Sequence, residues 1–423
     1  MGSLIQTIGR ILRDFIISIL LWIYVALAVF TWHLARMTPE WMVLARVAAS
    51  VINDLVWMPF GIFLWGLSFT VILRRIGILP ARGFFSGISV YLISAVFHVL
   101  FMDSAFRFLF IPLLITATYS IHRKITVRHE LHVFGRFLPL AIVAVLMVAR
   151  YQNQMIPNLK KVPKSGTLKV MSYNIFLDGG PEDREKVLAT IRGENADIVC
   201  CLEFNFLQDG PFFGKELGER YPYMLFSDNP KMPEFGSAIF SKHPIRKHKV
   251  DELMRARKKW SSRISIILAE VDVRGKTVNL VSYHLKSVGH FIEYIADKDY
   301  TLRWKIGWAR ERELKYDIEK YIQAQSLIEL ALDSPGPTIL CGDLNDTPNS
   351  RVFHLMQKNY TDTFSSRGWG VGATFGESHI REKLGWMPLV PLLARDVIRI
   401  DHIFVSGDIR ICRSKVISDA HGS

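Results

Sequence analysis

The chain has 423 residues, half of them hydrophobic and 22% charged, with a formal net charge of +13. This length exceeds one typical domain, so two or three domains are expected. Its four cysteines are too few for the disulfide framework of a small secreted protein. The positive charge suits either nucleic acid or the anionic headgroups of a membrane, so it does not separate these two classes of partner.

Long apolar runs fill the first 150 residues. Phe15 to Leu34 is an uncharged stretch of 20 residues, which is long enough to cross a ~30 Å hydrocarbon core. Further runs cover residues 56–73, 84–102, 108–121 and 137–149. We therefore predict that residues 1–150 form an all-α, multi-pass transmembrane region of four or five spans, with the lipid bilayer as its partner. An anchor is favoured over a transporter, which is the alternative suggested by polar residues within the region (His98, Asp103 and Arg107).

Basic residues in the short loops predict how this region is oriented, because cytoplasmic loops carry an excess of Lys and Arg. With five spans, three basic clusters fall on one side (Arg10 and Arg13; Arg74, Arg75 and Arg82; Arg123, Lys124, Arg128 and Arg136). That side is expected to be cytoplasmic, which makes the rest of the chain extracytoplasmic. Losing the weak fourth or fifth span would reverse the orientation.

A polar segment with prolines and lysines at residues 151–166 predicts a linker, and residues 167–423 have the pattern of a globular domain. Short apolar segments predict strands at residues 168–174, 196–203, 236–241, 262–273, 278–284, 338–341 and 399–406. Amphipathic segments predict helices at residues 182–193 and 316–332.

The predicted strands end in polar residues of a particular kind. Asn174, Glu203 and His284 each close a strand, Asp343 follows the strand at residues 338–341, and Asp401 lies near the start of the last strand. Asn345 lies two positions after Asp343, so the two side chains would share one side of an extended backbone. Carboxylates and amide oxygens bind a hard divalent ion, so Mg²⁺, or Mn²⁺ in its place, is the expected cofactor. No paired Cys or His residues at zinc-ligand spacing stand out.

These motifs occur in the order found in the endonuclease/exonuclease/phosphatase superfamily, the DNase-I-like fold, and the chain resembles that family from about Leu168 onward. The motifs are residues 172–175 (Ser-Tyr-Asn-Ile), 197–203, 236–241, 283–285, 342–348 (Gly-Asp-Leu-Asn-Asp-Thr-Pro) and 399–404 (Arg-Ile-Asp-His-Ile-Phe). The resemblance implies a four-layer α/β sandwich, with two packed β-sheets flanked by helices. It also implies a divalent-metal-dependent hydrolase that acts on a phosphodiester or phosphomonoester.

The resemblance also assigns roles for binding the metal and activating water. Glu203 would be the main metal ligand, with Asn174 as its partner. Asp343 would orient or deprotonate the attacking water.

The remaining roles concern the phosphoryl group. Asn345 would hold a phosphate oxygen, and His284 would hydrogen-bond the phosphoryl group or assist the leaving oxygen. Asp401 would orient a histidine near the chain end. Arg263 is a further candidate for phosphate contact.

One feature departs from the family pattern, which normally closes with Ser-Asp-His. This chain ends Ser-Asp-Ala-His-Gly-Ser at residues 418–423. We expect Ser423 to be the serine of this motif, so that the domain is truncated before the motif's Asp and His. In the alternative, His421 takes the place of the motif's histidine. Loss of a general base lowers rates by ~10² to 10⁴. The alternative function is therefore a catalytically impaired membrane binding or sensory protein that keeps the fold.

Basic and aromatic residues interleave in an insertion at residues 286–312. Such a segment suits nucleic-acid contacts or a membrane interface, and an amphipathic helix packed on the core is the plainer alternative. The phosphate-ester substrate is therefore left open between a lipid headgroup and nucleic acid. No protein partner can be inferred.

Overall fold

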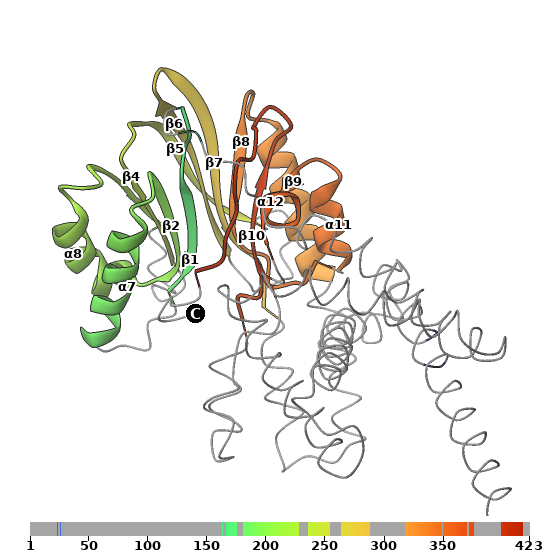
Figure 1. The fold of residues 1–423 in the computed structure, drawn as a ribbon, viewed down its shortest axis with the longest axis horizontal. Coiled ribbons are helices and arrows are strands. Elements are labelled where there is room, and N and C mark those ends of the chain that lie inside the picture. Colours follow the sequence, from blue (N-terminus) through green and yellow to red (C-terminus); the bar gives the residue numbers. More distant parts are fainter. Residues whose placement is uncertain are drawn as a thin grey trace, which may run out of the picture.

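The computed structural model describes residues 23, 26, 163, 166–175, 181–227, 236–253, 264–287, 318–348, 350–369, 372–375 and 399–417. Within these ranges, two mixed β-sheets pack together with helices on their outer faces (Figure 1). This arrangement confirms the predicted packing of two sheets flanked by helices. In the described part of the chain, no helix combines the length and the hydropathy needed to cross a bilayer. Apart from residues 23 and 26, the spans predicted at residues 15–149 lie outside the described residues. The same holds for almost all of the predicted linker, Arg263, residues 288–312 and His421.

The first sheet has the strand order β1-β2-β4-β3. Its strands are β1 (Val170–Asn174), β2 (Ile198–Phe204), β3 (Tyr223–Phe226) and β4 (Gly236–Ser241). β1 and β2 run parallel, whereas β4 pairs antiparallel with both β2 and β3. The parallel pair brings the carboxyl ends of β1 and β2 to the same edge.

The second sheet has the order β5-β6-β7-β8-β10-β9. Its strands are β5 (Ile245–Leu253), β6 (Ile264–Val273), β7 (Lys276–His284), β8 (Thr338–Asp343), β9 (Thr361–Asp362) and β10 (Asp401–Val405). β7 and β8 are parallel, and the other neighbouring pairs are antiparallel. The carboxyl ends of β7 and β8 therefore lie at the same edge of this sheet.

Alternation along the strands separates the core into layers, because successive side chains point to opposite faces. In β2, Ile198 and Cys200 pack between the sheets, whereas Val199 and Cys201 pack toward helices on the outer face. In β8, Cys341 packs between the sheets and Leu340 packs outward. Strands buried on both faces read as continuous apolar runs, which is how the sequence revealed them.

Helices cover the outer faces of both sheets. α7 (Pro181–Glu194) and α8 (Phe206–Leu217) lie over the first sheet, while a helix at residues 318–332 and α11 (Arg351–Gln357) lie over the second (Figure 1). A short α12 (Thr363–Arg367) follows β9. Side-chain oxygens of Asn205, Ser350 and Asp362 accept backbone N–H groups at the starts of α8, α11 and α12, which stabilises these helix ends.

The end of β8 differs from the extended backbone that the sequence suggested. The strand stops at Asp343, and Asn345 has a φ of +50°, in the left-handed region. The prediction that Asp343 and Asn345 share one side of an extended strand was therefore wrong. Gly342 is required just before this turn, because a Cβ there would lie 1.7 Å from the backbone oxygen of Tyr283 on the neighbouring strand.

Candidate active site

Strand pairing brings most of the predicted site residues together. His284, Asp343 and Asp401 lie side by side on β7, β8 and β10, because the ladder registers pair His284 with Asp343 and Asp401 with Asp343. β10 runs antiparallel to β8, so the first residue of β10, Asp401, lies beside the last residue of β8, Asp343. Asn174 and Glu203 come from the other sheet, near the ends of β1 and β2. The candidate site therefore lies where one edge of each sheet meets the other.

Glu203 reaches this site through a β-bulge. Simple alternation would point Glu203 toward the helices, as it does for Val199 and Cys201. The register of β2 against β4 shifts between Leu202 and Phe204, and Glu203 has a φ of +53°. Such a bulge redirects a side chain, and strained backbone of this kind concentrates at functional positions.

The side chains at this edge form a compact polar cluster. Asn174 Nδ2 lies 2.9 Å from Glu203 Oε1 and 3.4 Å from Asp343 Oδ2, donating toward both carboxylates. His284 Nε2 lies 3.7 Å from the same Glu203 oxygen and 3.8 Å from the same Asp343 oxygen. Four residues from both sheets thus face one small region, in which carboxylate oxygens predominate.

Burial controls the charges in this cluster. Burial, reinforced by the negative charge of Glu203, raises the pKa of Asp343 to about 7. Burial also lowers the pKa of His284, although Glu203 and Asp401 act in the opposite direction. The imidazole is therefore neutral at pH 7 and does not balance the carboxylates. A cation would relieve this imbalance.

The donor set fits a hard divalent ion. Mg²⁺ in proteins is commonly bound through one or two carboxylates and retains several waters. Glu203 would supply a carboxylate and Asn174 would offer Oδ1 after turning its amide, while the carboxylate of Asp343 lies beside them. Among the residues that the structure describes, no three His, Cys, Asp or Glu side chains form a preformed metal cage.

Replacing Asp343 with asparagine should stabilise the metal-free protein at neutral and alkaline pH. The folded-state pKa of about 7 lies above the ordinary value of 3.8, so stability is lost as pH rises from about 4 to about 7. Asparagine does not titrate, so the variant avoids this loss. The free energy of unfolding that Asp343 loses over this pH range is at most ~4 kcal/mol. We expect Asp343→Asn to raise the thermal midpoint in EDTA by about 2–10 °C at pH 8, and by little at pH 4. An unchanged or lower midpoint at pH 8 would contradict this account.

Asn345 and Asp401 border the cluster. The backbone N–H of Asn345 donates to Asp343 Oδ1 at 2.6 Å, and its Nδ2 donates to the Leu285 oxygen at 2.9 Å. Thr374 Oγ1 accepts the backbone N–H of Asp401 at 3.2 Å. Asn345 therefore connects the segments that follow β7 and β8, beside the carboxylate of Asp343.

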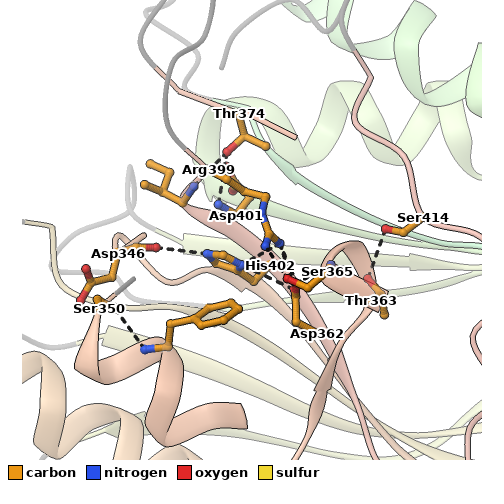
Figure 2. A network of polar contacts seen from close by, with 12 residues as sticks. Asp346, Ser350, Asp362, Thr363, Ser365, Thr374, Arg399, Asp401, His402 and Ser414 are labelled. Atoms are coloured by element: carbon orange, nitrogen blue, oxygen red, sulfur yellow. Dashed lines mark hydrogen bonds and ion pairs between the residues drawn. The ribbon is translucent and has the colours of Figure 1, made fainter. Parts of the chain in front are cut away.

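A second polar network, which the sequence did not reveal, lies behind this edge (Figure 2). Arg399 Nη1 lies 3.0 Å from Asp362 Oδ1 and 2.9 Å from Asp362 Oδ2, and its Nη2 donates to Ser365 Oγ at 3.1 Å. The Arg399 side chain is 3% exposed and the Asp362 side chain is fully buried. Burial alone would raise the pKa of Asp362, but the positive charge of Arg399 holds it well below its usual range.

His402 joins this network to the segment after β8. Its Nδ1 lies 3.1 Å from Arg399 Nη1 and its Nε2 lies 3.1 Å from the Asp346 backbone oxygen. Burial and the Arg399 charge lower the pKa of His402, which favours a neutral ring that accepts at Nδ1 and donates at Nε2. Strand alternation could have placed His402 on the opposite face from Asp401, but no local pattern identifies Asp362 as its neighbour.

A family model identifies the kind of domain. Residues 171–423 match the model of the Endonuclease/Exonuclease/phosphatase family. No curated protein matches the chain. Among solved structures, truncated TDP2 from Caenorhabditis elegans is 20% identical, covering 57% of this chain and 84% of its own, with a TM-score of 0.38.

Two bacterial structures are similar at the same level. An endonuclease/exonuclease/phosphatase family protein from Leptotrichia buccalis is 15% identical, covering 59% of this chain and 92% of its own, with a TM-score of 0.42. A mannosyl-6-phosphatase from Bacteroides thetaiotaomicron is 17% identical, covering 60% and 90%, with a TM-score of 0.42.

Proposed function

The chain belongs to the endonuclease/exonuclease/phosphatase family, and from this premise we propose that it is a membrane-tethered, divalent-metal-dependent phosphoesterase. Members of the family are hydrolases that act on phosphoester bonds. The observation that carries the proposal is the meeting of Asn174, Glu203, His284 and Asp343 within 2.9–3.8 Å contacts. These are oxygen and nitrogen donors of the kind that phosphoryl hydrolysis requires.

Each residue then has a chemical task in our proposal. Glu203 and Asn174 hold the metal, which when bound supplies Lewis-acid stabilisation of the charge that develops on the phosphoryl oxygens. Asp343 orients the attacking water and accepts its proton, because a pKa of about 7 suits a general base near neutral pH. The neutral ring of His284 donates a hydrogen bond to the phosphoryl group.

Asn345 and Asp401 complete the site in this proposal. The Asn345 amide has one N–H on the Leu285 oxygen, which leaves its second N–H for a phosphate oxygen. Asp401 adds negative charge near His284, which opposes the lowering of the ring's pKa by burial. Arg263 is retained as a further phosphate contact.

The tether rests on the sequence of residues 1–150, with its uncharged run at Phe15 to Leu34. Attachment to a bilayer makes a lipid headgroup an attractive substrate, while the net charge of +13 equally suits nucleic acid. Protease protection in sealed vesicles tests the extracytoplasmic placement of residues 167–423. Digestion of this domain only from the cytoplasmic face would contradict it.

Hydrolysis of a panel of phosphoesters tests the function. Full-length protein in detergent would be assayed with bis(p-nitrophenyl) phosphate, p-nitrophenyl phosphate, phospholipid vesicles, DNA and RNA, with Mg²⁺, Mn²⁺ or EDTA. We expect turnover of at least one substrate that EDTA abolishes and added Mg²⁺ or Mn²⁺ restores. Metal binding without turnover of any substrate would instead support the non-catalytic binding or sensory role, and activity in EDTA would contradict the metal dependence.

A further inference from the structure

The helix at residues 318–332 presents a buried polar face to the segments that carry the site. Glu319 and Gln323 are fully buried, and Lys320 is 3% exposed. Residues spaced by three and four positions lie on the same side of a helix, so Lys320 shares a side with Ala324 and Leu327, which pack in the apolar core. Such a position normally holds an apolar side chain, and burying an ammonium group is costly unless its donors are paired.

The ammonium of Lys320 binds the turn that follows β8. Its Nζ donates to the backbone oxygen of Asn345 at 2.6 Å and lies 3.7 Å from Asp346 Oδ2. Asn345 is the residue with a φ of +50°. A side-chain-bearing residue keeps such a conformation only when its surroundings fix it.

The same turn is held at several other points. His402 Nε2 contacts the Asp346 oxygen, the Asn345 N–H contacts Asp343 Oδ1, and the Asn345 amide contacts the Leu285 oxygen. Gln323 Oε1, from the same helix as Lys320, accepts the backbone N–H of Lys286 at 3.1 Å. The helix therefore fixes the segments after both β7 and β8, next to His284 and Asp343.

We propose that Lys320 is a positioning residue, whose contact with the Asn345 carbonyl holds the left-handed turn and so aims the Asn345 amide and the Asp343 carboxylate at the phosphoryl group. The inference rests on the proposed function. Lys320 touches neither metal nor substrate in this account. Its positive charge also opposes the rise in the pKa of Asp343 that burial causes, which agrees with its place behind the carboxylate.

The test compares Lys320→Met, which removes the charge at similar length, with Lys320→Arg and with Lys358→Met, a change of an exposed lysine after α11. For Mg²⁺-dependent hydrolysis of the best substrate from the panel, we expect Lys320→Met to lower kcat about 10- to 100-fold, because small misplacements of reacting groups are costly. Mn²⁺ affinity should change less than about threefold, since Glu203 and Asn174 lie on the other sheet, and any rise in KM should be smaller than the fall in kcat. Lys320→Arg should recover part of kcat, and Lys358→Met should match wild type.

Hydrogen–deuterium exchange of the full-length variants separates failure of this inference from failure of the proposed function. Lys320→Met should accelerate amide exchange in peptides spanning residues 343–348 at least about tenfold, with other described strands unchanged. Lys320→Gln serves if the methionine variant does not fold. Wild-type kcat in folded Lys320→Met or Lys320→Gln, or unchanged exchange at residues 343–348 in that variant, would overturn the positioning role. Absence of hydrolysis by wild type would overturn the proposed function. The hydrogen–deuterium exchange rate at residues 343–348 would still show whether Lys320 holds the turn.

Discussion

Glu203→Gln is expected to lower metal-dependent hydrolysis by about 10²- to 10³-fold, the range found when one group that stabilises transition-state charge is removed. Glutamine keeps the size of the side chain and can keep the contact with Asn174, whose amide lies 2.9 Å from Oε1. It removes the charge that binds the cation. The change should therefore affect chemistry far more than folding, as measured by kcat/KM at saturating Mg²⁺ and by the thermal midpoint.

Glu219→Gln is the matched control, because Glu219 is an exposed glutamate in the turn that follows α8. It removes the same charge from the protein without touching the cluster. Equal activity in wild type, Glu203→Gln and Glu219→Gln would place the reaction at another site.

Arg399→Met is expected to cause the largest loss of stability, about 3–5 kcal/mol, because it leaves a buried charge without its partner. The guanidinium contacts both oxygens of Asp362, whose side chain is fully buried. It also lies over the rings of Phe353 and Phe364, with its central carbon 5.7 and 5.1 Å from their centroids. Thermal or urea unfolding of the full-length protein measures the effect.

A double variant shows whether the uncompensated charge is the cause. Asp362→Asn keeps an acceptor for the Ser365 N–H at the start of α12 but removes the negative charge. Arg399→Met combined with Asp362→Asn should recover part of the loss, since non-additivity reports the interaction between the two residues. Arg413→Met, at an exposed position, should be nearly neutral. A loss for Arg399→Met no larger than that for Arg413→Met would contradict the buried pair.

Strands buried on both faces could be predicted from sequence with good accuracy. The expected strands at residues 196–203 and 338–341 correspond to β2 and β8, because each contains a continuous apolar run that is buried on both faces. β5 was not predicted. Arg246, Lys247 and other charged residues alternate with few apolar ones along it, and its place in the sheet comes from the ladder with β6. α8 was missed because Pro211 interrupts a helical pattern, whereas burial of Phe213 and Leu217 outweighs that weak local preference.

The site was predictable as a set of residue types but not as a geometry. Asn174, Glu203, His284 and Asp343 stand out because each ends an apolar run. The bulge that redirects Glu203 depends on pairing with β4, a non-local contact that no short segment encodes. Lys320 did carry a local signal, since it falls in line with Ala324, Leu327 and Ala331 on the apolar side of its helix. What it binds could be known only once β8 and its turn were in place.

Binding of Mn²⁺ to the full-length protein, followed by electron paramagnetic resonance with Mg²⁺ as competitor, tests the central claim without requiring a known substrate. We expect wild type to bind Mn²⁺ at one site from which Mg²⁺ displaces it. Glu203→Gln should weaken that binding at least about tenfold, whereas Glu219→Gln should leave it unchanged. Equal Mn²⁺ affinity in wild type and Glu203→Gln would contradict a metal centre at the meeting edges of the two sheets.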